Sequence, residues 1–173
     1  MAASLAKSPH VALDTNFIID LADGDEVCRD CMGVLQESKS TPRLIITPTV
    51  LQELAWLAGK ASSKEVRRLA TTGLRSLVTW QIIPVNLVPV AHGIAERISD
   101  EIRSKRLLPF EEKNDSLVVA EAALCDCDIL VSSDQQVTGI SRDELHALLA
   151  RFDVKRIEIW WPQAIVSRLG KNN

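Results

Sequence analysis

The sequence predicts a single three-layer α/β/α domain with a mainly parallel sheet of about five strands. Short apolar runs, many of them β-branched, alternate with longer segments in which apolar residues recur at helical spacing. At 173 residues, the chain has the length of one ordinary domain. No internal repeat and no linker rich in Pro, Gly or Ser divides it. This alternation is typical of domains in which helices cover both faces of a parallel sheet.

Five short apolar runs are expected to form the strands, and capping residues mark helix starts between them. Thr47 followed by Pro48 places a cap before a proline at the first helical position. The capping-box pattern Ser-x-x-Glu begins at Ser62 and again at Ser141. The expected strands are residues 11–13, 44–46, 81–83, 129–131 and 156–160.

Two longer helical segments are expected between the second and fourth strands. One covers residues 62–80 and the other covers residues 90–107. Together they predict a helical arm around residues 62–107 of a domain that spans residues 1–173. The loop "LLPFEEKND" then returns the chain to the sheet.

The composition is typical of a soluble globular protein, with 46% hydrophobic and 25% charged residues. The longest apolar stretches are far shorter than the roughly 20 residues that a membrane span needs. The N-terminal "MAASLAKSPH" lacks the apolar core of a signal peptide, so we expect a cytoplasmic protein with no membrane partner. The net charge of −3 argues against a generic nucleic-acid coat, but it allows an enzyme with an acidic centre and a basic rim.

The four cysteines leave two interpretations open. Cys28 and Cys31 are spaced as C-x-x-C, and Cys125 and Cys127 as C-x-C, so they could form a redox pair or two halves of a zinc site. Both pairs lie in or beside segments of helical pattern, without the Gly and Pro that usually turn thiolates toward one metal. Buried thiols in a reducing cytosol are the favoured interpretation.

Four acidic residues are expected at one edge of the sheet. Asp14 follows the first strand directly, and Asp134 follows the fourth strand after a short turn. Asp115 lies on the inward stripe of the helix "NDSLVVAEAAL", and Glu53 lies in the second turn of the helix after the second strand. In open parallel sheets, the carboxyl ends of the strands and the starts of the following helices share the edge where ligands bind.

Each acid also has a purely structural explanation. Asp14 and Asp134 could be turn or capping residues, Asp115 could complement a helix dipole, and Glu53 could lie at a boundary with its carboxylate in water. We favour a shared site, because all four explanations would otherwise have to hold independently. Four carboxylates packed together would repel one another and take up protons unless a cation offset their charge. Oxygen ligands suit Mg²⁺ or Mn²⁺, and no histidine stands at zinc-ligand spacing to a cysteine.

These acids stand in segments that resemble the PIN domain, the nuclease fold named after the N-terminus of PilT. The segments are, in order, "ALDTNFIIDL", "LIITPTVLQELAWL", "NDSLVVAEAAL" and "ILVSSDQQV", and the run "RIEIWWP" is similar to the closing strand of the family. Each segment alone is a weak signal, whereas four in series are fairly specific. The resemblance implies a central parallel sheet of about five strands with helices on both faces.

The resemblance also implies an activity, cofactors and partners. It implies hydrolysis of RNA phosphodiester bonds with one or two Mg²⁺ or Mn²⁺ ions, and many short relatives are VapC-like toxins held by a small antitoxin protein. We therefore expect an RNA substrate, an antitoxin if the chain is a toxin, and a homodimer. The residues implied as catalytic and metal-binding are Asp14, Glu53, Asp115 and Asp134, with Asn16 and Ser132 in supporting positions.

Two features depart from the family pattern. Gln135 and Gln136 follow the last acid where many relatives carry another acidic or polar residue, which leaves the binding of a second metal ion open. The segment 62–113 is longer than in the most compact members, so the shape of the substrate is not implied.

Hydrolysis by metal-activated water is the chemistry that the remaining motifs leave. The chain has no GxxxxGK[ST] phosphate loop and no Asp-x-Asp after the first strand, and its cysteines have no histidine beside them in sequence. Asp14, Asp115 and Asp134 would hold the ion, and Glu53 would bind a second ion or orient the attacking water. The alternative hypothesis is a catalytically silent module of the same fold that binds RNA or protein.

The basic and aromatic residues are less informative. Two groups of basic residues could contact phosphates, although solvated helix faces are the favoured explanation. Trp56 and Trp80 are expected in the core rather than as base-stacking platforms. The basic residues are Lys64, Arg67, Arg68 and Arg75 in one group, and Arg97, Arg103, Lys105 and Arg106 in the other.

Overall fold

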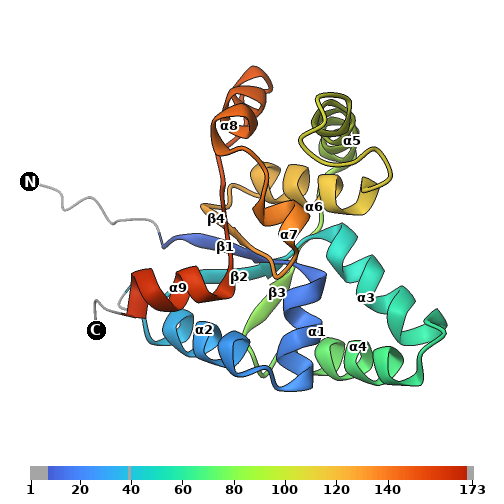
Figure 1. Ribbon diagram of the computed structural model, residues 1–173, viewed down its shortest axis with the longest axis vertical. Helices are drawn as coiled ribbons and strands as arrows, with labels where there is room; N and C mark the ends of the chain where they lie inside the picture. The colour runs from blue at the N-terminus through green and yellow to red at the C-terminus, as the bar shows by residue number, and fades with distance from the viewer. Residues whose placement is uncertain (1–7, 39, 171–173) are drawn as a thin grey trace, which may run out of the picture.

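In the computed structural model, which describes residues 8–38 and 40–170, five parallel strands form one sheet in the order β3-β2-β1-β4-β5 (Figure 1). The predicted fold class is confirmed. The third strand begins one residue later than predicted, because Gln81 has a φ of 58° and belongs to the preceding turn. Pro84 ends this strand, which lies at an edge of the sheet where proline is tolerated. The strands are β1 (His10–Leu13), β2 (Arg43–Ile46), β3 (Ile82–Pro84), β4 (Ile129–Val131) and β5 (Glu158–Trp160).

Helices cover both faces of this sheet, as Figure 1 shows. On one face lie α1 (Thr15–Asp23), α2 (Glu26–Glu37), α3 (Pro48–Lys60), α4 (Lys64–Ser76) and α9 (Pro162–Leu169). On the other lie α5 (Pro89–Ser104), α6 (Lys113–Leu124), α7 (Gln135–Thr138) and α8 (Arg142–Arg151). Right-handed crossovers explain the division. The chain moves from β1 to β3 in one direction and then returns past β1 to β4 and β5, so the helices between β3 and β5 fall on the opposite face.

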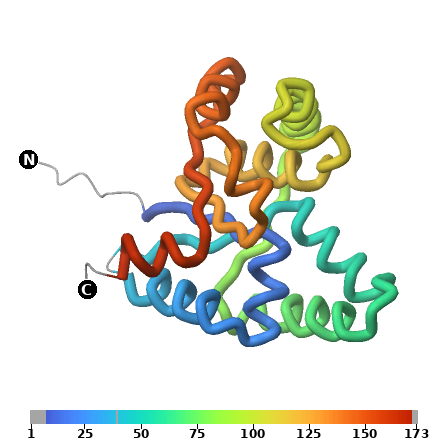
Figure 2. Tube along the Cα trace, viewed as in Figure 1, coloured from blue at the N-terminus to red at the C-terminus, as the bar shows by residue number. Residues whose placement is uncertain are grey.

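The region expected to form a helical arm is divided between the two layers. α4 packs against α1 and α3, whereas α5 packs against α6 and α8. Strand β3 lies between α4 and α5 in sequence and joins the sheet beside β2. Figure 2 shows α5 and α8 standing together on the far side of the sheet from α4. Residues 62–107 are therefore part of the sandwich rather than a projection from it.

The helix starts agree with the cap signals to within one residue. Thr47 caps α3 and Pro48 occupies its first turn, as predicted. The cap of α4 is Ser63, one residue after the predicted Ser62, and its hydroxyl accepts a hydrogen bond from the backbone N–H of Val66. Ser141 stands at the N-cap of α8 without a side-chain hydrogen bond to the helix.

The core lies on both faces of the central strand β1, whose residues Val11, Ala12 and Leu13 are buried. Within the described residues, the four cysteines are free thiols, three of them buried, and burial raises the pKa of each to about 11 or 12. Trp80 packs against the core as predicted. The prediction for Trp56 is wrong, because this side chain is 59% exposed. No helix in the described part of the chain has the length and apolar character needed to cross a bilayer.

Candidate active site

The carboxyl ends of β1 and β4 form the point where the strand order reverses. The chain leaves β1 toward β2 on one side, and β4 lies against β1 on the other side. In open α/β sheets, ligands bind in the crevice outside such a reversal. Asp14 follows β1 at this point, and its backbone N–H donates to the carbonyl oxygen of Val131 at the end of β4, at 3.0 Å.

Asp14 is buried, and its carboxylate is held by two hydrogen bonds. The backbone N–H of Thr15 donates to Oδ1 at 2.7 Å, and the hydroxyl of Ser132 donates to Oδ2 at 2.7 Å. Burial raises the pKa of Asp14 to about 6, although both hydrogen bonds act to lower it. The negative charges of Glu53 and Asp134 raise this pKa further. Asp14 is therefore an oriented carboxylate whose negative charge is only partly compensated by the protein.

Ser132 connects Asp14 to Asp134. Its side-chain oxygen, which donates to Asp14, also accepts a hydrogen bond from the backbone N–H of Asp134 at 3.1 Å. Asp134 caps α7, because its Oδ1 accepts from the backbone N–H of Gln136 at 2.6 Å. Asp14 and Asp134 therefore each cap a helix and are joined through Ser132, so the capping explanation does not exclude a shared site.

Glu53 reaches the site from α3, on the opposite side of Asp14 from β4. The hydroxyl of Thr15 donates to Oε2 of Glu53 at 2.6 Å, so this one residue contacts two of the predicted acids, Asp14 through its backbone N–H and Glu53 through its side chain. Thr15 was not predicted as part of the site. The signal that could have found it is a hydroxyl side chain directly after the acid that ends the first strand.

Asp115 projects from the first turn of α6 and interacts with the same group of carboxylates. Burial raises its pKa to about 7, and the charge of Asp14 and a side-chain hydrogen bond to Glu112, which favours the protonated form of Asp115, raise it further. Asp134 makes a smaller contribution in the same direction. Glu112 is the N-cap of α6 and was not predicted as part of the site. Its spacing of three residues from Asp115 places both side chains on one side of the helix start.

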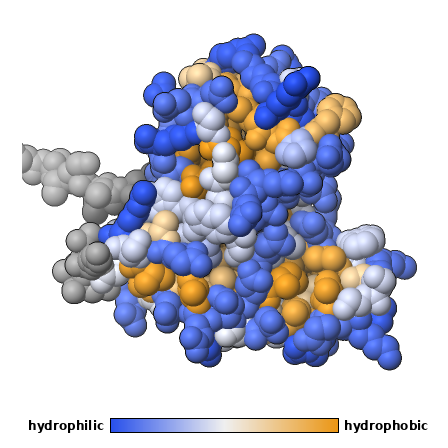
Figure 3. Space-filling model, in the orientation of Figure 1, coloured by the Kyte–Doolittle hydropathy of each residue, from blue (hydrophilic) through white to orange (hydrophobic). Residues whose placement is uncertain are grey.

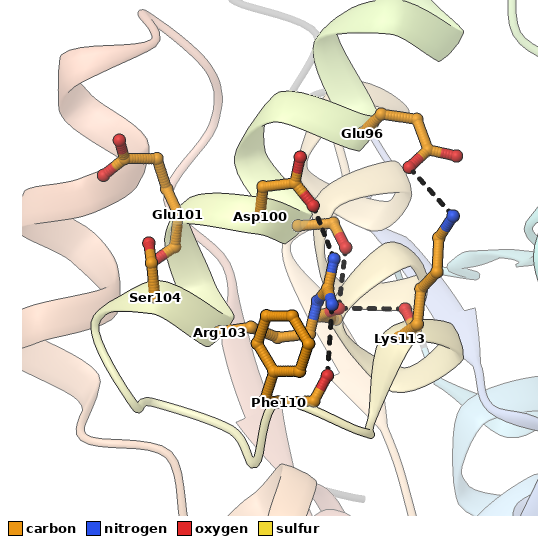
Figure 4. A network of polar contacts seen from close by, with 9 residues as sticks. Glu96, Asp100, Glu101, Arg103, Ser104, Phe110 and Lys113 are labelled. Carbon is orange, nitrogen blue, oxygen red and sulfur yellow. Dashed lines mark hydrogen bonds and ion pairs between the residues drawn. The ribbon is translucent and has the colours of Figure 1, made fainter.

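The segment that leads into α6 is fixed by the buried side chain of Arg103 (Figure 4). Its guanidinium donates to the carbonyl oxygen of Phe110 at 3.1 Å and pairs with Asp100, and the ring of Phe110 lies 5.1 Å from its Cζ. Lys113 at the start of α6 forms an ion pair with Glu96 of α5 at 3.4 Å. Arg103 belongs to a group of basic residues that could contact phosphates or form a solvated helix face, and the structure gives it neither role: it is buried and holds the segment that leads to Glu112 and Asp115.

The other predicted residues lie outside this network. Asn16 is the second residue of α1 and is exposed to solvent. Arg68 on α4 is paired with Glu65 one turn before it, and the guanidinium of Arg97 lies over the ring of Phe152 at 5.9 Å. Some basic residues on α4 and α5 thus contact other side chains of the protein. For Arg68, the exposed pairing with Glu65 favours the explanation as part of a solvated helix face.

The residues that meet here fit a hard divalent cation that keeps part of its water shell. Within residues 8–38 and 40–170, no three carboxylate, imidazole or thiol side chains come close enough to enclose a metal ion by themselves. However, the pKa values of Asp14 and Asp115 are both raised by burial and by neighbouring negative charge, and a cation would relieve this repulsion. Mg²⁺ retains several waters and takes only a few carboxylates, so an open set of oxygen ligands suits it.

The family model of the PIN domain matches residues 11–143, a range that contains all four predicted acids. The chain belongs to the PIN domain family. No curated protein sequence matches it at a significant level. Two of the solved structures that resemble this PIN domain are of VapBC proteins.

VapBC2 from Rickettsia felis, solved bound to a DNA fragment from its promoter, matches with a TM-score of 0.60 and 15% identity, over 88% of this chain and 98% of the other. VapBC-1 from nontypeable Haemophilus influenzae matches with a TM-score of 0.56 and 13% identity, over 89% of this chain and 98% of the other. At these identities, the likeness establishes that the PIN domain shares their fold.

Proposed function

We propose that the chain is a metal-dependent endoribonuclease that hydrolyses phosphodiester bonds of RNA with one or two Mg²⁺ or Mn²⁺ ions. The observation that carries the proposal is the electrostatic interaction of Asp14 with Glu53, Asp115 and Asp134, which come from three other parts of the chain. These carboxylates lie at the reversal of strand order, where α/β sheets bind ligands. Membership of the PIN domain family supports a nuclease activity.

Each acid has a distinct role in this proposal. Asp14 and Asp134, which are linked through Ser132, present fixed carboxylates at the ends of two adjacent strands. Asp115 faces them from α6 and completes the metal-binding set. Glu53, which is held by the hydroxyl of Thr15, either binds a second ion or accepts a hydrogen bond from the attacking water. A divalent ion held by these residues would lower the pKa of a bound water and would offset the charge that develops on the phosphate.

We further propose that the protein acts in the cytoplasm as the toxin of a toxin–antitoxin pair and forms a homodimer. The structural neighbours are VapBC assemblies, and the described cysteines are free thiols, which suits a reducing compartment. The face in Figure 3 shows apolar residues over α1 and α4 and between α5 and α8, which are candidate surfaces for protein partners. Co-purification with a small neighbouring gene product and sedimentation of the purified chain test these assignments.

Cleavage of RNA by the purified chain tests the enzyme assignment. We expect cleavage of single-stranded RNA in Mg²⁺ or Mn²⁺ and none in EDTA. Asp115→Asn should lower kcat by at least about 100-fold, because it removes a carboxylate from the metal-binding set. Asp30→Asn is the matched control, because Asp30 is an exposed acid on α2. Equal activity of the two variants would reject the role of Asp115.

The second candidate function is a silent module that binds RNA without cutting it. Two observations favour it: Gln135 and Gln136 follow Asp134, and the described residues contain no closed metal site. Titration calorimetry with Mn²⁺ separates the two functions. Binding of RNA without metal, together with no heat from Mn²⁺, would favour the silent module.

A further inference from the structure

A cavity of about 520 Å³ adjoins the carboxylates, between α3 and α6. Its lining includes Glu53 from the acidic site and Asn114, the residue before Asp115. The α3 side and the α6 side of the cavity therefore each adjoin one of the predicted acids. Its volume lies in the range of sites that enclose a small organic group. A substrate whose phosphate lies at the acids would place its neighbouring parts at the mouth of this cavity.

Trp56 gives the cavity one broad aromatic surface. It follows Glu53 by three residues, so the two side chains lie on the same side of α3, one turn apart. Leu57 and Leu117 add smaller apolar surfaces. Trp56 is 59% exposed, which leaves much of its ring available for contact with a ligand in the cavity. Burial in the core, which the sequence analysis expected, therefore does not explain this residue.

The remaining lining offers hydrogen bonds without positive charge. Gln52 and Asn114 line the cavity, and their side-chain amides make no hydrogen bond to any residue that the structure describes. No Lys, Arg or His belongs to the lining. The cavity therefore suits a flat, uncharged group with donors and acceptors on its edge, and it repels a phosphate because Glu53 lies at its wall.

We infer that this cavity binds one unpaired base of the RNA substrate beside the phosphate that is cut, with Trp56 as the stacking surface. The inference rests on the proposed function and names its substrate class, which is single-stranded RNA. A stacked and paired base cannot enter such a cavity, whereas unpaired bases in loops and single strands are recognised by aromatic stacking and by hydrogen bonds to their edges. A protein segment fits less well, because docked helices and strands use rows of apolar contacts, and this lining presents one ring between two amides.

Binding of a single-stranded oligoribonucleotide, with Mg²⁺ replaced by Ca²⁺ to slow cleavage, tests the inference in the full-length chain. Trp56→Ala should raise Kd by at least about fivefold, the lower end of what one base–aromatic stack contributes. Trp56→Phe should recover most of the loss, because it restores an aromatic face. Trp161→Ala is the matched control, since Trp161 is also exposed but caps α9 and does not line the cavity. The control should leave Kd unchanged.

A second measurement locates the base. A single abasic nucleotide is moved along the oligonucleotide, one position at a time, and the cleavage efficiency kcat/KM of wild type and Trp56→Ala is compared in Mg²⁺. In wild type, we expect kcat/KM to fall when the abasic nucleotide stands at one position next to the cut. At that position, the abasic nucleotide and Trp56→Ala should lower kcat/KM no further together than either does alone, because both remove the same stacking contact.

The outcomes separate this inference from the proposed function. If wild type neither binds nor cuts RNA, the proposed function fails and the inference fails with it. If wild type cuts RNA and Trp56→Ala has an unchanged Kd and the same profile of abasic positions, only the inference is overturned. If Trp56→Ala weakens a complex with a co-expressed antitoxin and leaves RNA binding intact, the cavity binds protein and the base assignment is wrong.

Discussion

At the scale of single residues, the site depends on how a buried carboxylate is kept ionised. Asp14 receives hydrogen bonds from the Thr15 backbone and from the Ser132 hydroxyl, both of which favour the charged form. Burial and the neighbouring acids oppose it more strongly, so the pKa of Asp14 is raised to about 6. The protein thus supplies orientation but not a full counter-charge, which is the property expected of a cation ligand.

The pH dependence of the folding stability, measured in EDTA, reports on this uncompensated charge. The raised pKa values of Asp14 and Asp115, about 6 and 7, mean that the folded chain binds these protons more tightly than the unfolded chain does. The resulting stability is complete below the unfolded pKa near 4 and is lost as the pH rises through the folded values. We therefore expect the melting temperature of metal-free wild type to fall between pH 4 and pH 7.5 relative to Asp14→Asn.

At pH 8 without metal, Asp14→Asn should be more stable than wild type by about 1–3 kcal/mol, which corresponds to several degrees in melting temperature. Asparagine keeps one acceptor oxygen for the cap of α1, and its amide N–H can donate to the Ser132 oxygen in place of accepting from it, so the charge is the main change. Asp30→Asn should show neither the stabilisation nor the altered pH profile. A destabilised Asp14→Asn variant at pH 8 would show that the carboxylate is compensated within the folded chain.

At the scale of elements, the sequence was most informative where one local signal decides the outcome. The apolar run before Asp14 and the pair Thr47-Pro48 predicted β1 and the start of α3. The roles of Glu112 and Arg103 were not predicted, because they depend on how the loop before α6 folds against α5. The exposure of Trp56 was not predicted, because helical spacing did not show whether another element covers that side of α3.

The loop before α6 gives the prediction at this scale. Arg103→Met keeps the aliphatic volume but removes the hydrogen bond to the Phe110 carbonyl and the pairing with Asp100. We expect faster amide hydrogen exchange in residues 105–113 and a fall in kcat/KM of at least about tenfold, because Glu112 and Asp115 lose their fixed approach. Lys105→Met, at an exposed position beside the same loop, should change neither measurement. Unchanged exchange in Arg103→Met would contradict the anchoring role.

At the scale of the whole molecule, the strand order places the site. Because β1 is central and the chain departs from it in both directions, loops and helices from four separate parts of the sequence meet beyond its carboxyl end. The fold is stable only if its favourable interactions exceed both the chain entropy and the repulsion among these acids. A ligand that binds the folded acids and not the unfolded chain must therefore raise the stability of the entire domain.

Thermal unfolding with and without Mg²⁺ tests this coupling. At a Mg²⁺ concentration ten times its Kd, binding contributes about 1.4 kcal/mol, or about 3–5 °C for a domain of this size. Sodium chloride at equal ionic strength separates site binding from general screening, since it weakens repulsion at any exposed acid. Mg²⁺ should raise the melting temperature of wild type clearly more than sodium chloride does. The two salts should raise the melting temperature of Asp115→Asn by equal amounts. Equal gains in wild type would mean that the acids repel one another without forming a site for the ion.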